Sequence, residues 1–194
     1  MAASSGSRIS HDTHSTTAGS GWSTKRLAIT AFFCALSLVV SFIEIPIFPP
    51  AAWLKYDPSC VVALVAGLCF GPVTGVLVTT LAWVLRLLFS FNPWGNLMAI
   101  IANVTLIAPA VVLYERLGRT RKALVVGLVA GAAVSLACCI VANIIVTPLY
   151  TAVSVADVID MIVPYLIPFN LIKLVLNCVI TALVVGPVQK LVER

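Results

Sequence analysis

The sequence predicts an all-α integral membrane protein: a bundle of six transmembrane helices whose N- and C-termini are both cytoplasmic. Of the 194 residues, 61% are hydrophobic and only 10% are charged, and the mean hydropathy is +1.10. Ordinary soluble domains do not reach such values. Several charge-free runs also exceed the roughly 20 residues that a helix needs to cross about 30 Å of hydrocarbon. One helical bundle therefore accounts for nearly the whole chain.

The number and direction of the spans follow from the positions of charges and helix breakers. The expected spans are six apolar runs, at 26–43, 58–70, 73–90, 95–115, 122–146 and 168–190. Gly71-Pro72 interrupts the region 58–89, which fits either one kinked helix or two helices joined by a tight turn. Basic residues precede the first span and follow the fourth: Lys25, Arg26, Arg116, Arg119, Arg121 and Lys122. Because cytoplasmic loops are rich in Lys and Arg, both groups belong inside, and Gly71-Pro72 becomes a cytoplasmic turn.

The segments outside the spans differ in composition. Residues 1–24 are rich in Ser, Thr, Gly and Ala, and we expect a disordered cytoplasmic tail followed by a membrane domain at 25–194. Two imidazoles in this tail, His11 and His14, make at most a weak metal site. On the outer side, connections at 44–59 and 147–167 contain several prolines and are predicted to be ordered apolar loops that cover the bundle as a lid.

The sequence contains no recognisable set of catalytic residues. It lacks a phosphate-binding loop, the HExxH and GxSxG motifs, and a pair of carboxylates inside a span. We therefore expect no enzymatic activity, and any use of ATP must belong to another polypeptide. The net charge of +5 comes mostly from residues at the ends of apolar runs, where charge orients a membrane protein, so we expect no nucleic-acid partner.

One lysine lies within an apolar run and needs an explanation, because a lysine in the bilayer centre costs a few kcal/mol on insertion scales. Lys173 and Asn170 are three residues apart, so they share one face near the outer end of the last span. Asn143 in the fifth span lies at a similar depth. These residues either form a ligand site, or Lys173 extends to the interface while the asparagines hydrogen-bond between helices.

Other residues near the outer interface also allow two interpretations. Arg86 is expected to be an interfacial anchor or to pair with Glu44 or Asp160. Trp53 and Tyr56 in the first loop either belong to an aromatic belt or cover an aromatic ligand.

Small residues recur at four-residue spacing in two spans. Ala31 and Ala35 lie in the first span, and Gly127 and Gly131 in the fifth. Such faces allow helices to approach closely, either within the bundle or at the surface of a partner subunit.

Four segments together resemble a known family: FPPAAWLKYDPS, ALVAGLCFGPVTGVLV, NIIVTPLY and PFNLIK. In this order they are similar to the substrate-binding S components of energy-coupling factor vitamin transporters, and among these to the riboflavin-specific branch. The similarity runs from about Lys25 to the C-terminus. It implies a multi-pass protein of the prokaryotic plasma membrane that binds riboflavin from outside under a lid formed by the first loop. It also implies association, through Ala31 and Ala35, with a transmembrane coupling subunit and two ATP-binding subunits.

The expected ligand site combines polar residues of the later helices with the first loop: Asn143, Asn170, Lys173, Trp53, Leu54, Lys55 and Tyr56. No metal or cofactor is expected, and riboflavin is the transported ligand. The uracil-like edge of a flavin presents an acceptor, a donor and an acceptor, which asparagine amides and an ammonium group can match. A pterin favours a carboxylate partner instead, and the positive charge of thiamine disfavours a nearby lysine.

Several alternatives stay open at this point. The substrate can be flavin mononucleotide, another vitamin or a related small molecule. A small ion-driven secondary transporter would need carboxylates or a histidine near mid-membrane, and the predicted spans contain neither. A membrane enzyme acting on lipids would need metal-binding carboxylates at the interface, for which Asp157 and Asp160 are the candidate pair.

Overall fold

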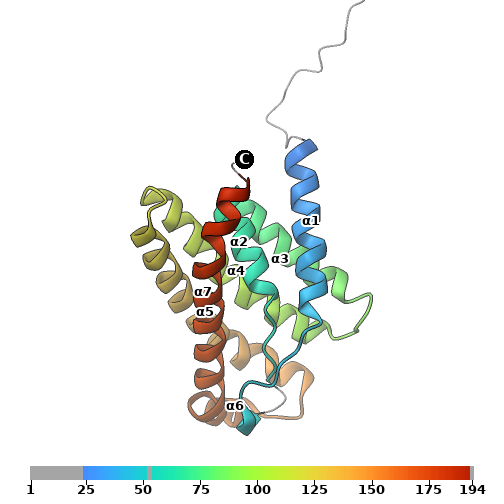
Figure 1. Ribbon diagram of the computed structural model, residues 1–194. Coiled ribbons are helices and arrows are strands. Elements are labelled where there is room, and N and C mark those ends of the chain that lie inside the picture. Colours follow the sequence, from blue (N-terminus) through green and yellow to red (C-terminus); the bar gives the residue numbers. More distant parts are fainter. Residues whose placement is uncertain (1–23, 52–53, 193–194) are drawn as a thin grey trace, which may run out of the picture.

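The described residues form a bundle of helices (Figure 1). The structure, a computed structural model, describes residues 24–51 and 54–192. Its α-helices are α1 (Thr24–Ser41), α2 (Ser59–Phe70), α3 (Pro72–Arg86), α4 (Pro93–Arg116), α5 (Arg121–Tyr150), α6 (Val155–Met161) and α7 (Ile167–Val192). A short 3-10 helix, η1 (Pro49–Ala51), precedes α2, and a π-helical segment, η2 (Ile162–Leu166), joins α6 to α7. The predicted all-α class is confirmed for these residues.

Within the described residues, four helical stretches are long and apolar enough to cross a membrane: Thr24–Ser41, Pro93–Arg116, Arg121–Tyr150 and Val155–Val192. The apolar helices α2 and α3 are shorter. Six crossings and cytoplasmic termini therefore stay predictions. Most of the expected tail at 1–24, with both of its histidines, lies outside the described residues, and so does Trp53.

The break at Gly71-Pro72 separates two helices. Gly71 has φ +99°, in the region that favours glycine, and it lies between the end of α2 and the start of α3. Pro72 takes the first position of α3, where its missing N–H removes no helical hydrogen bond. The prediction of two helices is thus confirmed, and a single kinked helix is excluded.

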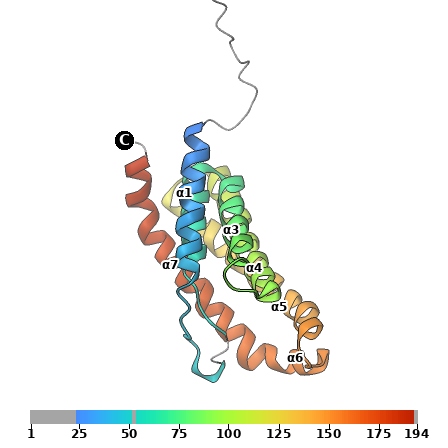
Figure 2. The same cartoon turned by 90° about the vertical axis from the view of Figure 1, so that its right-hand side faces the viewer.

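The segments that carry the predicted cytoplasmic charges meet at one end of the bundle, where α1 begins and α7 ends (Figure 1). Arg26 Nη2 donates hydrogen bonds to Phe70 O at 2.9 Å and to Thr74 Oγ1 at 3.1 Å, which links α1 to the α2–α3 turn. Gln189 Nε2 on α7 donates to Tyr114 Oη on α4 at 3.2 Å. The loop after α1 and the helix α6 lie at the opposite end (Figure 2).

The glycines of the fifth predicted span pack inside the bundle. A Cβ atom at Gly127 would lie 2.5 Å from Ala110 O, and one at Gly131 would lie 2.5 Å from Leu106 O. The backbones of α4 and α5 therefore approach at distances that only glycine allows. Ala31 and Ala35 differ, because both are exposed on α1.

The connection at 147–167 is not the long loop that the sequence predicted. α5 continues through Pro148 to Tyr150, and α6, η2 and α7 follow almost without interruption. Ser154 and Asp157 form a capping box in which each side chain accepts a hydrogen bond from the backbone N–H of the other residue. This arrangement satisfies N–H groups of the first turn, and a new helix starts within the connection.

The first loop is closed at its base by one pair of residues. Ile45 and Tyr56 form an antiparallel bridge, in which each backbone N–H donates to the other residue's carbonyl at 2.8 Å. The described loop residues 46–51, 54 and 55 extend beyond this bridge, at the end of the bundle that holds the candidate site.

Candidate ligand-binding site

A cavity of about 350 Å³ is lined by residues of the first loop and of the helix ends near it. Its walls come from the first loop, the last turn of α3, the first turns of α4, the last turns of α5 and the start of α7. Pockets for small molecules in proteins usually have volumes of about 300–1,000 Å³. The predicted residues that line this cavity are Leu54, Lys55, Asn143, Asn170 and Lys173.

Lys173 is mostly buried and is paired with an acidic residue of the first loop. Its Nζ lies 3.2 Å from Asp57 Oδ2, and the exposed fractions of the two side chains are 11% and 6%. Asp57 Oδ1 accepts hydrogen bonds from the backbone N–H of Ser59, at 3.3 Å, and from the Ser59 hydroxyl. The lysine therefore has an ionic partner at the cavity wall and does not extend to the interface.

The two asparagines present amide groups to the same cavity. Asn170 Nδ2 donates to Leu166 O at 2.8 Å, and Asn143 Nδ2 donates to Cys139 O at 2.8 Å, each within its own helix segment. Asn143 Oδ1 also accepts a hydrogen bond from Thr147 Oγ1 at 3.3 Å. A primary amide has two N–H donors, so one N–H of each asparagine remains for a ligand.

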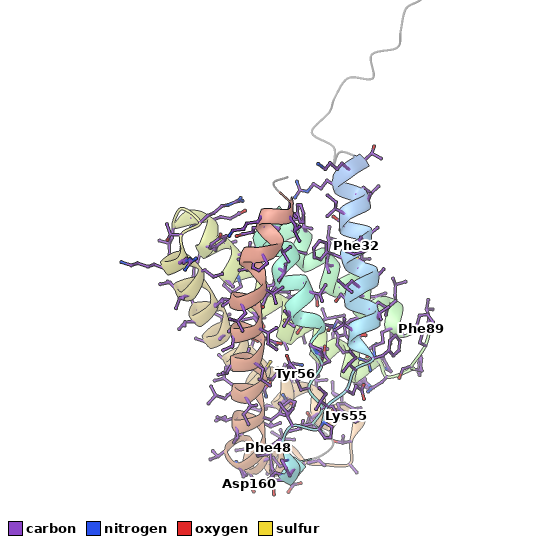
Figure 3. The ribbon with its side chains drawn as sticks, in the orientation of Figure 1. Phe32, Phe48, Lys55, Tyr56, Phe89 and Asp160 are labelled. Atoms are coloured by element: carbon purple, nitrogen blue, oxygen red, sulfur yellow. The ribbon has the colours of Figure 1, made fainter. Side chains whose placement is uncertain are left out.

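Tyr56 does not line the cavity, although it neighbours residues that do. It is 4% exposed, and its hydroxyl donates a hydrogen bond to Asn177 Oδ1 on α7 at 3.1 Å. Burial, and to a smaller extent the nearby Cys60 and Asp57, raise the pKa of Tyr56 to about 12, so the phenol stays protonated and can donate this bond. Tyr56 thus attaches the loop to α7. Figure 3 shows Tyr56 beside Lys55 at the base of the loop.

A second charged group lines the cavity on the side of α3. Arg86 is 6% exposed and donates hydrogen bonds to Ser41 O, at 2.6 Å, and to Glu44 Oε1. Lys55 Nζ donates to Glu44 Oε2 at 2.7 Å, and this bond, with the bond and charge of Arg86, lowers the pKa of Glu44. Of the alternatives considered for Arg86, the structure shows the pairing with Glu44.

Aromatic rings enclose the guanidinium of Arg86. Its Cζ lies 4.7 Å from the centre of a Trp83 ring and 5.3 Å from the centre of the Phe42 ring. Such cation–π contacts hold the planar group in place. Asp160, the other partner considered for Arg86, is exposed on α6 near the lower end of the bundle in Figure 3.

The sequence analysis missed several residues of the cavity wall. Asp57 is the most important of them, and one signal pointed to it, because it is the only acidic residue between Glu44 and Glu115. Asn96 on α4 was also missed; its Nδ2 donates to Trp83 O at 3.0 Å. Asn96 and Asp57 are both buried and both line the cavity, and a few polar groups in an otherwise apolar lining are typical of a ligand site.

Comparisons with known proteins identify relatives of the chain. The riboflavin transporter RibU of Staphylococcus aureus is 34% identical over 113 residues, which are 57% of this chain and 58% of RibU. The riboflavin transporter FmnP of Bacillus subtilis is 28% identical over 113 residues, 56% of this chain and 59% of FmnP. The matches thus span somewhat more than half of these relatives.

A solved structure shares the fold of the whole bundle. It is a structure of the S component of a bacterial ECF transporter, with a TM-score of 0.75 and 30% sequence identity. The superposition covers 88% of this chain and 98% of that one. The family model for "ECF transporter, substrate-specific component" matches residues 25–185. The chain therefore belongs to the family of substrate-specific components of ECF transporters.

Proposed function

We propose that this chain binds riboflavin from the extracellular side and serves as the substrate-specific subunit of an ATP-driven transporter. The observation that carries the proposal is the cavity in which Lys173, Asn143 and Asn170 converge. The names of the two relatives, both riboflavin transporters, support the choice of substrate. As substrate-specific components of transporters, members of this family are not a class of enzymes.

The donors of the cavity match one edge of a flavin. The uracil-like edge of the isoalloxazine ring offers two carbonyl oxygens and one N–H between them. The Lys173 ammonium has three N–H groups, of which Asp57 takes one, so it can donate to a carbonyl oxygen. A free N–H of an asparagine can serve the other oxygen, and an amide oxygen can accept from the ring N–H. Apolar side chains such as Leu54, Leu166 and Phe169 are available for the ring faces.

The position of the cavity supports entry from outside. It lies at the end of the bundle opposite the basic residues of the α4–α5 turn, Arg116, Arg119, Arg121 and Lys122. Under the positive-inside rule that basic end is cytoplasmic, which places the cavity and the first loop on the extracellular side. The loop then acts as the lid under which riboflavin is held.

Energy for transport must come from partner subunits. The sequence contains no phosphate-binding loop of the GxxxxGK[ST] type, so we assign ATP hydrolysis to two ATP-binding subunits that act through a transmembrane coupling subunit. The exposed, small side chains of Ala31 and Ala35 on α1 leave room for a helix of that subunit to pack closely.

The proposal is tested first by binding. The full chain is purified in detergent, its visible absorption is recorded, and riboflavin is titrated while quenching of flavin fluorescence is followed. Yellow protein and saturable quenching are expected, and neither thiamine nor folate should displace the bound riboflavin and restore its fluorescence. Equal competition by another vitamin would move the assignment to a different substrate.

Uptake separates ATP-driven transport from ion-coupled transport. Cells that express the chain are compared with and without a functional ATP-binding subunit, using radioactive riboflavin. Uptake that disappears with the ATPase supports the proposal. Uptake that persists without the ATPase and collapses when the ion gradients are dissipated would instead identify a secondary transporter.

A further inference from the structure

We infer that Asp57 is a positioning residue for ligand binding, which fixes the Lys173 ammonium at the cavity wall and balances its charge so that the site accepts an uncharged ligand edge. This inference rests on the function proposed above. It adds to the site an acidic residue that the sequence analysis did not assign.

The first observation is the geometry of the ion pair. Lys173 Nζ and Asp57 Oδ2 are 3.2 Å apart, both side chains are nearly buried, and both residues line the cavity. A lysine side chain has four rotatable bonds and a large conformational entropy. A single buried carboxylate that accepts one of its three N–H groups restricts the ammonium to one place, and the remaining two N–H groups are available to a ligand.

The second observation is that Asp57 is itself held in place by contacts that do not involve the ligand. Its Oδ1 accepts hydrogen bonds from the backbone and the hydroxyl of Ser59, at the start of α2. The preceding residue, Tyr56, bonds to Asn177, which lies four positions after Lys173 on α7. Two consecutive loop residues therefore contact two successive turns of one face of α7, so the carboxylate has a defined position along that helix.

The third observation is the balance of charge. Lys173 and Asp57 are oppositely charged and together neutral, whereas at the other side of the cavity Glu44 pairs with both Arg86 and the half-exposed Lys55, so one net positive charge remains there. A buried lysine without its carboxylate would leave an uncompensated positive charge in the cavity, which is strongly unfavourable in a site of low polarity. Such a site would favour an anionic ligand. With Asp57 present, the wall around Lys173 is neutral and favours the neutral amide-like edge of a flavin.

A cycle of four proteins tests the inference: the parent chain, Asp57→Asn, Lys173→Met and the double variant. Riboflavin is titrated against each in detergent. Asp57→Asn is expected to weaken binding roughly tenfold to a hundredfold, similarly to Lys173→Met, because both remove a fixed ammonium. If Asp57 acts through Lys173, the double variant binds as weakly as Lys173→Met, within about twofold. Losses that multiply in the double variant would overturn the inference.

Stability is measured in parallel, because removal of one member of a buried ion pair can unfold a protein. The double variant contains neither charge and is expected to fold even if a single variant does not. The riboflavin affinity of the double variant is compared with that of Lys173→Met, or with that of the parent if Lys173→Met does not fold. A double variant that binds riboflavin as tightly as the parent contradicts the inference. Asp160→Asn, which removes an exposed carboxylate at the same end of the bundle, is the control and should bind as the parent does.

The same measurements separate this inference from the proposed function. If the parent chain does not bind riboflavin, the proposed function fails. If the parent binds riboflavin and Asp57→Asn binds it equally well, the proposed function stands and the positioning role of Asp57 is wrong.

Discussion

Arg86 of α3 forms an ion pair with Glu44 at the start of the first loop, and the same carboxylate accepts a hydrogen bond from Lys55 near the end of that loop. The Glu44 side chain thus connects the two ends of the first loop to each other and to α3. The bridge between Ile45 and Tyr56 lies next to this charged cluster. The base of the first loop is therefore fixed by Glu44, Lys55 and the bridge, and we predict that any opening of the loop for a ligand breaks these contacts.

Replacement of Glu44 by Gln is expected to speed ligand release. The substitution removes the charge that holds Arg86 and Lys55 together, so the loop opens more often. Because Arg86 is buried, we expect an increase in the dissociation rate of roughly threefold to tenfold, with little change in the association rate. Stopped-flow recovery of riboflavin fluorescence measures the rate.

Glu115→Gln is the matched control, since Glu115 forms an exposed ion pair with Arg119 at the opposite end of the bundle. An equal acceleration in both variants would show that general loosening of the protein, and not the lid, controls release.

The attachment of the lid should depend on pH in a specific direction. The hydrogen bond from Lys55, with the bond and charge of Arg86, lowers the pKa of Glu44 below its ordinary value of 4.5. The stabilising effect of the carboxylate is therefore complete above pH 4.5 and disappears as the pH falls through the lowered pKa. Release from the parent chain should accelerate in this acidic range and approach the rate of Glu44→Gln. A rate for Glu44→Gln that rises equally with acid would assign the effect to another group.

Gly131→Ala is expected to destabilise the bundle. The added Cβ would lie 2.5 Å from Leu106 O and 2.9 Å from Ala110 Cβ, so α4 and α5 would have to separate. Overpacking of this kind costs about 1–3 kcal/mol. Gly186→Ala on α7 is the control, because a Cβ there meets nothing within 4 Å. Thermal unfolding in detergent should show a lower midpoint for Gly131→Ala alone, and equal midpoints would contradict the close approach of the two helices.

The small residues of α1 are expected to serve transport and not binding. Leu at Ala31 or Ala35 adds bulk to an exposed face, so riboflavin affinity should stay at the parent value while uptake falls to background. Ala133→Leu, an equal change at an exposed position of α5, should leave both properties unchanged. Loss of binding together with transport in the α1 variants would mean that the face packs inside the bundle.

The parts of the fold that could be predicted depend on local signals. Gly71 adopts a positive φ and Pro72 occupies the first position of a helix, and both preferences are properties of the residues themselves. The break between α2 and α3 could therefore be predicted from these two residues. The helix α6 was missed because Pro148 and Pro164 were taken as loop residues. They lie instead in the last turn of α5 and in the π-helical segment, where each proline leaves one helical hydrogen bond unmade without ending the helix.

Helical spacing and depth in the membrane allowed three of the cavity-lining residues to be predicted from the sequence. Asn170 and Lys173 share a face of α7, and Asn143 comes to the same cavity because it lies at the same depth in α5. That these residues bind a ligand stays a prediction. The pairing of Lys173 with Asp57 joins positions 116 residues apart, and a single sequence shows that a buried lysine needs a partner without showing which one. Tyr56 was placed over the ligand, but the structure puts it against Asn177.

The most direct test of riboflavin binding at Lys173 is a titration of Lys173→Met. A hydrogen bond to a charged group contributes about 1.5–3 kcal/mol, so the affinity for riboflavin should fall roughly tenfold to a hundredfold, whereas Asn170→Ala should cost about 1 kcal/mol. Because Lys173→Met leaves Asp57 without its partner, folding is verified by thermal unfolding before quenching of riboflavin fluorescence is recorded. We predict weak binding by a folded variant, and a folded Lys173→Met that binds riboflavin as tightly as the parent would contradict the assignment of the site.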